Sequence, residues 1–272
     1  MNNKYAIING ALTPESSASV LVADLSIQRG YGIFDFLSVQ NFKPVFLEDH
    51  LNRFYFSAHA MHLQVNYTQQ ELTNWILDLI KVNQMPYSGV RITLTGGYSE
   101  DGYSITTPNL IITQSALNQP VSNINEGIKL VTYEHLRQLP EVKTINYLQA
   151  IYLQPFIKQQ QANDILYHYN GLVCECPRAN FFIVTHENEI ITPLKNILNG
   201  ITRSKILSFN QFKSYEADIT LNEMYEAKEA FITSTTKNII PVLQIDGRMI
   251  GDGRAGKISQ QLYTTLLNLK KE

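Results

Sequence analysis

Short β-rich runs recur along the whole chain, and this recurrence is the strongest constraint on its fold. In the first part, runs bounded by Gly, Asn or Pro occupy residues 5–12, 33–39, 90–95 and 110–113. Two segments between them have a helical period instead. Residues 49–61 carry an apolar stripe at steps of three and four, and residues 68–71 have capping-box spacing ahead of a second apolar face. The first part therefore predicts an α/β domain.

A polar stretch without clear periodicity, residues 115–126, is the best candidate for a linker. It predicts a first domain over residues 1–114 and a second over residues 127–272. In the second part, strands are expected at 172–176, 181–184, 190–191 and 229–232, and helices at 147–161, 204–212 and 258–269. Pro155 should either kink the first of these helices or stand in its first turn.

Composition narrows the function to small-molecule chemistry. The 272 residues are 44% apolar and 17% charged, which is globular, and no apolar run is long enough to span a bilayer. The net charge is −2 and neither sign forms a block, so neither nucleic acid nor a membrane surface is an expected partner. The N-terminus has no signal-peptide pattern, so a cytoplasmic location is expected.

Two cysteines, Cys174 and Cys176, stand one residue apart. In an extended segment their side chains would point to the same face. Two thiols alone make neither a zinc site nor a disulfide framework, so we expect reduced packing residues and no bound metal. Weak metal binding or redox sensing are the alternatives.

Two polar segments are candidate phosphate sites. Residues 199–203, Asn-Gly-Ile-Thr-Arg, open an expected helix, whose N-terminus would offer free backbone N–H groups and a hydroxyl. Residues 233–236 place four hydroxyls directly after an apolar strand. Judged alone, each is more often an ordinary capped helix or an ordinary turn.

These segments belong to an ordered set of motifs. The set comprises Asp-His-Leu-Asn-Arg at 49–53, Val-Lys-Thr-Ile-Asn at 142–146, Glu175 five residues before Asn-Phe-Phe at 180–182, Leu-Asn-Gly-Ile-Thr-Arg at 198–203 and Phe-Ile-Thr-Ser-Thr-Thr at 231–236. In this order the motifs resemble the fold-type IV, or class IV, aminotransferases, which depend on pyridoxal 5′-phosphate (PLP). That family includes branched-chain aminotransferases, D-amino acid transaminases and 4-amino-4-deoxychorismate lyases. The resemblance covers about residues 5–268.

The resemblance implies a two-domain α/β (α+β) protein with PLP between a smaller N-terminal α/β domain and a larger, β-barrel-like C-terminal domain. It also implies a homodimer. Lys143 matches the lysine that carries PLP as a Schiff base, and an amine that condenses with an aldehyde and then moves a proton suits this chemistry. Glu175 matches the carboxylate on the pyridine nitrogen and Arg53 the phosphate-binding arginine. The remaining implied cofactor contacts are Leu198 on the ring and Ile201, Thr202, Ser234 and Thr235 around the phosphate.

The substrate pocket departs from parts of the family pattern. D-amino acid transaminases have tyrosine where Phe34 stands, and deoxychorismate lyases have threonine where Phe36 stands. Both commonly have arginine in place of Gly96, so its absence argues against both substrates. Arg91 matches an arginine near the substrate carboxylate of branched-chain enzymes, although an arginine in a strand is as often structural. After Glu175, Cys-Pro-Arg-Ala at 176–179 replaces the usual glycine and small hydroxyl residues.

The sequence thus predicts a transaminase that moves an amino group between an amino acid, expected to be L with an apolar side chain, and a 2-keto acid. Alternatives are a PLP-dependent lyase on the same scaffold, a PLP-binding protein without catalysis, and a plain interaction domain. The last two are disfavoured by the intact set of Lys143, Glu175 and Arg53.

Overall fold

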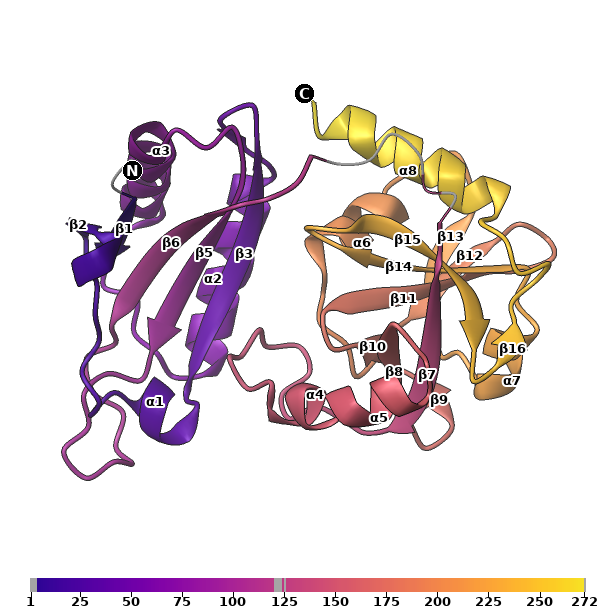
Figure 1. Ribbon diagram of the computed structural model, residues 1–272, viewed down its shortest axis with the longest axis horizontal. Coiled ribbons are helices and arrows are strands. Elements are labelled where there is room, and N and C mark those ends of the chain that lie inside the picture. The colour runs from indigo at the N-terminus through magenta and orange to yellow at the C-terminus, as the bar shows by residue number, and fades with distance from the viewer. Residues whose placement is uncertain (1–3, 120–123, 125, 272) are drawn as a thin grey trace. The chain divides into compact units, whose positions relative to one another are not determined.

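The computed structural model describes residues 4–119, 124 and 126–271. The chain forms two compact units, one of residues 1–119 with 142–146 and the other of residues 120–141 with 147–272 (Figure 1). The α/β fold class is confirmed. Within the expected linker, residues 120–123 and 125 lie outside the described residues, and residues 115–116 end a strand.

The first unit contains an antiparallel sheet in the order β2-β1-β6-β5-β3-β4. Its strands are β1 (Tyr5–Ile8), β2 (Ala11–Pro14), β3 (Gly32–Gln40), β4 (Lys43–Pro44), β5 (Tyr87–Thr95) and β6 (Leu110–Ala116). The single run expected at residues 5–12 is wrong, because β1 and β2 form a hairpin. Asn9 and Gly10, with φ of 49° and 86°, make the two-residue turn that an Asn-Gly pair favours.

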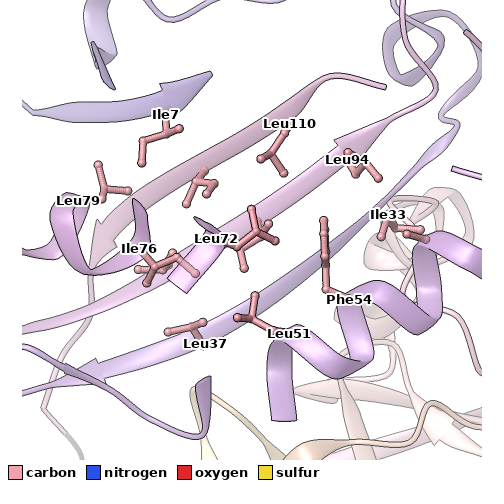
Figure 2. Packing of buried hydrophobic residues seen from close by; sticks show 14 of the residues in the cluster. Ile7, Ile33, Leu37, Leu51, Phe54, Leu72, Ile76, Leu79, Leu94 and Leu110 are labelled. Atoms are coloured by element: carbon pink, nitrogen blue, oxygen red, sulfur yellow. The ribbon is translucent and has the colours of Figure 1, made fainter. Parts of the chain in front are cut away.

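The helices of this unit are η1 (Glu15–Ser17), α1 (Leu25–Arg29), α2 (Leu47–Ala60) and α3 (Gln69–Asn83). The expected capping box is confirmed, since Thr68 and Glu71 cap the N-terminus of α3 reciprocally. Figure 2 shows apolar side chains of α2 and α3 packed against side chains of the sheet. Leu51 and Phe54 come from α2, and Ile76 comes from α3. This core fixes where α2 presents its remaining side chains.

Residues 142–146 join the first unit along the start of β3. Phe34 N donates to Lys143 O at 2.9 Å, and Ile145 N donates to Gly32 O at 3.1 Å. The amide of Lys143 also donates to Ser57 Oγ on α2 at 3.3 Å. The backbone of Lys143 is therefore held by both a strand and a helix.

The second unit is built on a sheet with the path β13-β12-β11-β14-β15-β7-β8-β9, with β10 on β11 and β16 on β15 (Figure 1). Its strands are β7 (Ile128–Glu134), β8 (Asp164–Tyr169), β9 (Leu172–Val173), β10 (Glu175–Cys176), β11 (Ala179–Val184), β12 (Ile190–Pro193), β13 (Ser214–Ala217), β14 (Glu229–Ser234), β15 (Asn238–Ile245) and β16 (Arg248–Met249). Its helices are α4 (Leu148–Tyr152), α5 (Gln154–Gln159), α6 (Ile201–Leu207), α7 (Leu221–Tyr225) and α8 (Lys257–Leu269).

Two helix expectations change in this unit. The segment 147–161 is split into two helices, α4 and α5. Pro155 lies in the first turn of α5, which was one of the two positions predicted for it. The helix expected at 204–212 is wrong at both ends, since α6 begins at Ile201 and ends at Leu207. Gly200 has an extended conformation and acts as N-cap, so the helix starts inside the Asn-Gly-Ile-Thr-Arg motif. None of the helices in the described ranges is long and apolar enough to cross a membrane.

The two cysteines are free and buried, as expected. Their expected common face is wrong, because Cys174 packs with Val131 and Tyr167 whereas Cys176 packs in a separate cluster with Phe181. The strand breaks between β9 and β10, which reverses the alternation of side chains. Burial raises the pKa of Cys174 to about 11 and that of Cys176 well above its ordinary value. Both thiols are therefore protonated packing groups at neutral pH.

Candidate active site

Arg53 is held by a buried carboxylate in the first unit. Its Nε donates to Asp35 Oδ2 at 2.8 Å and its Nη2 donates to Asp35 Oδ1 at 2.8 Å. Asp35, in the middle of β3, is fully buried. Burial alone would raise the pKa of this carboxyl, but the charge and hydrogen bonds of Arg53 and His50 hold it well below its usual range. Arg53 is thus part of a fixed cluster and not a mobile charge on the helix surface.

His50 completes this cluster. Its Nδ1 lies 2.7 Å from Asp35 Oδ1, and the ring is buried. Burial lowers the pKa of His50 most strongly, and the positive charges of Arg53 and Lys143 lower it further, against the opposing effect of Asp35. The side chain of Lys143 is therefore close enough to this cluster to act on it electrostatically.

Phe34 lies beside both Lys143 and Arg91. The centroid of its ring is 4.6 Å from Lys143 Nζ and 3.8 Å from Arg91 Cζ. These three side chains come from β3, from β5 and from the segment 142–146, so the structure brings together the expected lysine and two of the expected substrate residues. Cations over an aromatic face are attracted by its negative quadrupole.

Phe36 projects from the same face of β3 as Phe34, two residues away. Its ring covers Gly89 of β5, where an added Cβ would lie only 1.9 Å from Phe36 Cζ. At Gly96 an added Cβ would lie 2.8 Å from Leu25 Cδ1 and 3.0 Å from Tyr31 Cδ1, so these side chains would have to shift to admit a larger residue. The packing around position 96 in this protein is therefore fitted to glycine.

Glu175 is the centre of a polar cluster in the second unit. Arg137 donates to Glu175 Oε1 from Nε at 2.9 Å, and its Nη2 lies 2.8 Å from the same oxygen. On the other oxygen, Oε2 accepts from Asn180 Nδ2 at 3.2 Å and from the amide of Leu198 at 3.0 Å. The side chain is only about one-twentieth exposed, at 5%. These partners fix the orientation of the carboxylate through charge-assisted hydrogen bonds.

The unusual residues after Glu175 form a tight hairpin. Glu175 pairs with Asn180 and Cys176 with Ala179, which leaves Pro177 and Arg178 as the turn. Asn180 Nδ2 also donates to the carbonyl of Leu198 at 2.7 Å. One amide side chain therefore ties the carboxylate to the segment that enters α6.

The expected phosphate residues occur on neighbouring elements of the second unit. Ile201 and Thr202 open α6, which packs against β14. Ser234 ends β14, and Thr235 begins the turn that leads into β15. Ser234 Oγ accepts from Lys237 N at 3.2 Å, which closes that turn. Backbone amides and hydroxyls of this kind are the donors that a phosphate group accepts.

Four residues of these clusters were not predicted as site residues from the sequence: Asp35, His50, Arg137 and Asn180. His50 and Asn180 lie inside recognised motifs, and a charged Asp35 within an apolar run was a detectable signal. Arg137 is separated from Glu175 by 38 residues, and no local pattern joins them. The donor set as a whole, with an amine on Lys143, a carboxylate on Glu175 and several hydroxyls, fits the functional groups of PLP.

Comparisons with known proteins agree with this chemistry. The family model for amino-transferase class IV matches residues 32–245. The chain is 29% identical over 271 residues to a D-alanine aminotransferase of Bacillus licheniformis, covering 96% of this chain and 95% of that protein. It is 28% identical to one of Staphylococcus haemolyticus, covering 94% of each.

Solved structures show the same fold. The crystal structure of a T.th. branched-chain amino acid aminotransferase with pyridoxamine 5′-phosphate superimposes with a TM-score of 0.91 at 21% identity, covering 99% of this chain and 95% of that one. A branched-chain aminotransferase of Thermoproteus uzoniensis with norvaline gives a TM-score of 0.88 at 25% identity, covering 99% of this chain and 96% of that one. Since the family model spans most of the chain, the protein belongs to the amino-transferase class IV family and is a PLP-dependent aminotransferase.

Proposed function

We propose that this aminotransferase exchanges amino groups between an L-amino acid with an apolar side chain and a 2-keto acid, and that Lys143 carries its PLP. The observation that supports this substrate class is the face of β3 that bears Phe34 and Phe36, where Lys143 Nζ lies over the ring of Phe34. Two aromatic rings favour an apolar substrate side chain and leave a second carboxylate poorly solvated.

Lys143 and Glu175 have the two central roles in this proposal. When bound, PLP supplies an aldehyde that condenses with amines and a ring that accepts the electrons released when the Cα proton leaves. The ε-amine of Lys143 would take the proton from the substrate Cα and pass it to the aldehyde carbon of the cofactor. Glu175 would accept a hydrogen bond from the pyridine nitrogen of the cofactor, and Arg137 orients this carboxylate.

The phosphate is assigned to Arg53 and to the hydroxyl cluster, which we call the phosphate cup. The cup consists of Ile201, Thr202, Ser234 and Thr235. Leu198, whose amide is bound by Glu175, would pack on the cofactor ring. Arg53 supports the assignment because Asp35 fixes its guanidinium, so little conformational entropy is lost when an anion binds.

The closed space at Gly96 supports the preference for L-amino acids. Position 96 cannot hold the carboxylate-binding arginine of the D-amino acid pattern unless Leu25 and Tyr31 move. Arg91, stacked on Phe34, is the cation assigned to the substrate carboxylate. The competing candidate is D-alanine, because the curated relatives described above act as D-alanine aminotransferases.

A panel of half-reactions tests the substrate. Stopped-flow absorbance would compare L-leucine, L-phenylalanine, D-alanine and L-aspartate as amino donors. We expect the two apolar L-amino acids to react fastest, and faster reaction of D-alanine or L-aspartate would contradict the pocket assignment. Multiple turnovers should require a keto acid acceptor, whereas a lyase would release pyruvate without one.

We also propose a homodimer. Leu148, Ile151 and Tyr152 form an apolar stripe on α4 and are 76%, 62% and 72% exposed in the single chain. A second copy of the chain would cover this stripe, which a molar mass from light scattering would detect. A cytoplasmic location remains a prediction, which the two free cysteines support. Domains over residues 1–114 and 127–272 also remain a prediction, although Val142 packs in the hydrophobic cluster of the first unit.

A further inference from the structure

The second unit buries an ammonium group that the proposed chemistry does not use. Lys270, just after the last residue of α8, is only 7% exposed. Lysine is almost never buried to this extent unless its charge is paired. The next residue, Lys271, is exposed, and its Nζ donates to Asn268 Oδ1. The burial of Lys270 is therefore specific to its position.

Lys270 binds both ends of the turn between β14 and β15. Its Nζ donates to Asn238 Oδ1 at 2.5 Å and to the carbonyl of Thr235 at 3.4 Å. Asn238 has a φ of +58°, in the left-handed region that side chains rarely adopt, and Tyr263 of α8 shares a hydrogen bond with its side chain. Tyr263 of α8 and Lys270 at its C-terminal end thus hold a turn whose first residue, Thr235, belongs to the phosphate cup.

Within the described part of the chain, no counter-ion is recorded for the charge of Lys270. Among the residues that the structure describes, its recorded partners are a carbonyl and an amide, and no carboxylate pairs with it. Burial lowers its pKa to about 8, which leaves it protonated for the most part at neutral pH. An anion bound at the turn would offset the cost of burying this ammonium.

We propose that Lys270 is a positioning residue of the phosphate cup, which fixes the turn at 235–238 and balances the charge of the cofactor's phosphate. This inference rests on the proposed function, because that function assigns Ser234 and Thr235 to the phosphate. Lys270 is not proposed to touch the reacting atoms. Its effect should therefore depend on whether the ligand has a phosphate group.

Comparing PLP with pyridoxal, which lacks the phosphate, tests this dependence. The full-length protein is freed of cofactor by dialysis, and dissociation constants for both ligands are measured by absorbance titration. We expect Lys270→Met to weaken PLP binding about tenfold, as loss of a charge-assisted contact does. The dissociation constant for pyridoxal should stay within about twofold of the parent value, because pyridoxal has no phosphate dianion whose charge Lys270 could balance. Equal losses for the two ligands would show a merely structural role and overturn the proposal.

Two further variants keep the result interpretable. Lys271→Met removes a neighbouring exposed charge and should leave both dissociation constants unchanged. Lys270→Gln retains a hydrogen-bond donor without a charge, and it replaces the methionine variant if circular dichroism shows that variant to be unfolded. A parent protein that binds pyridoxal as tightly as PLP would contradict the phosphate cup itself. A parent that prefers PLP, with a folded Lys270 variant that keeps the full preference, would contradict only the role of Lys270.

Discussion

Asp35 accepts two parallel hydrogen bonds from Arg53, so a carboxylate buried in β3 orients the guanidinium of α2. Removing one member of such a buried pair leaves the other charge uncompensated. We expect Asp35→Asn to lower the free energy of unfolding by about 3–5 kcal/mol, the usual cost of breaking a buried ion pair. Urea unfolding measures this loss. Asp78→Asn, on the exposed side of α3, is the matched control and should change stability little.

The same carboxyl predicts an acid-sensitive fold. Because the pKa of Asp35 is held below its usual range in the folded protein, the unfolded chain binds more protons as the pH falls through about 4. The stability from this group is present above that pH and is lost progressively below it. Unfolding free energies measured from pH 5 to pH 3 should fall with a shallower slope in Asp35→Asn than in the parent. Equal slopes would mean that Asp35 does not titrate as its contacts require.

Arg53→Ala should weaken cofactor binding. Losing a charge-assisted contact to the phosphate costs on the order of 2–3 kcal/mol of PLP affinity. The variant also leaves Asp35 without its partner, so stability must be measured alongside the dissociation constant. The double variant Asp35→Asn with Arg53→Met removes both charges and should recover stability but not PLP affinity. An unchanged dissociation constant in Arg53→Ala would exclude its phosphate role.

Glu175→Gln should retain the fold and cofactor but lose most of the half-transamination rate. An amide cannot hold the proton on the pyridine nitrogen while negative charge develops at Cα. A single-turnover rate within about threefold of the parent, under 0.7 kcal/mol of barrier, would contradict this role. Glu226→Gln changes an exposed carboxylate of the same unit and serves as the control.

Borohydride reduction should attach the cofactor to Lys143 and to no other lysine. This prediction is based on the packing of Lys143, whose backbone is held by β3 and whose Nζ lies 4.6 Å from the centroid of the Phe34 ring. Peptide mapping by mass spectrometry identifies the modified residue. A pyridoxyl group found on a different lysine would overturn the assignment, and Lys143→Ala should yield no modified peptide.

Local patterns in the sequence were enough to predict most elements of this protein. The apolar stripe of α2 and the reciprocal cap of Thr68 and Glu71 depend on residues at most a few positions apart, so their physics is visible along the chain. The order of the motifs also indicated the family. The hairpin at Asn9 and Gly10 was missed although its turn pair was present.

Only the tertiary structure could show which charged side chains form ion pairs. Arg137 and Glu175 pair across 38 residues, and Asp35 receives Arg53 because α2 packs on the face of β3 that carries it. The opposite placement of Cys174 and Cys176 likewise follows from a strand break that no local signal marks. Side-chain partners are chosen by packing between distant segments, whereas helix period and capping are chosen by neighbours in sequence. That difference is why the sequence indicated the family and many of the elements, although not β7, β8 or β15, whereas the fold determined the ion pairs of the site.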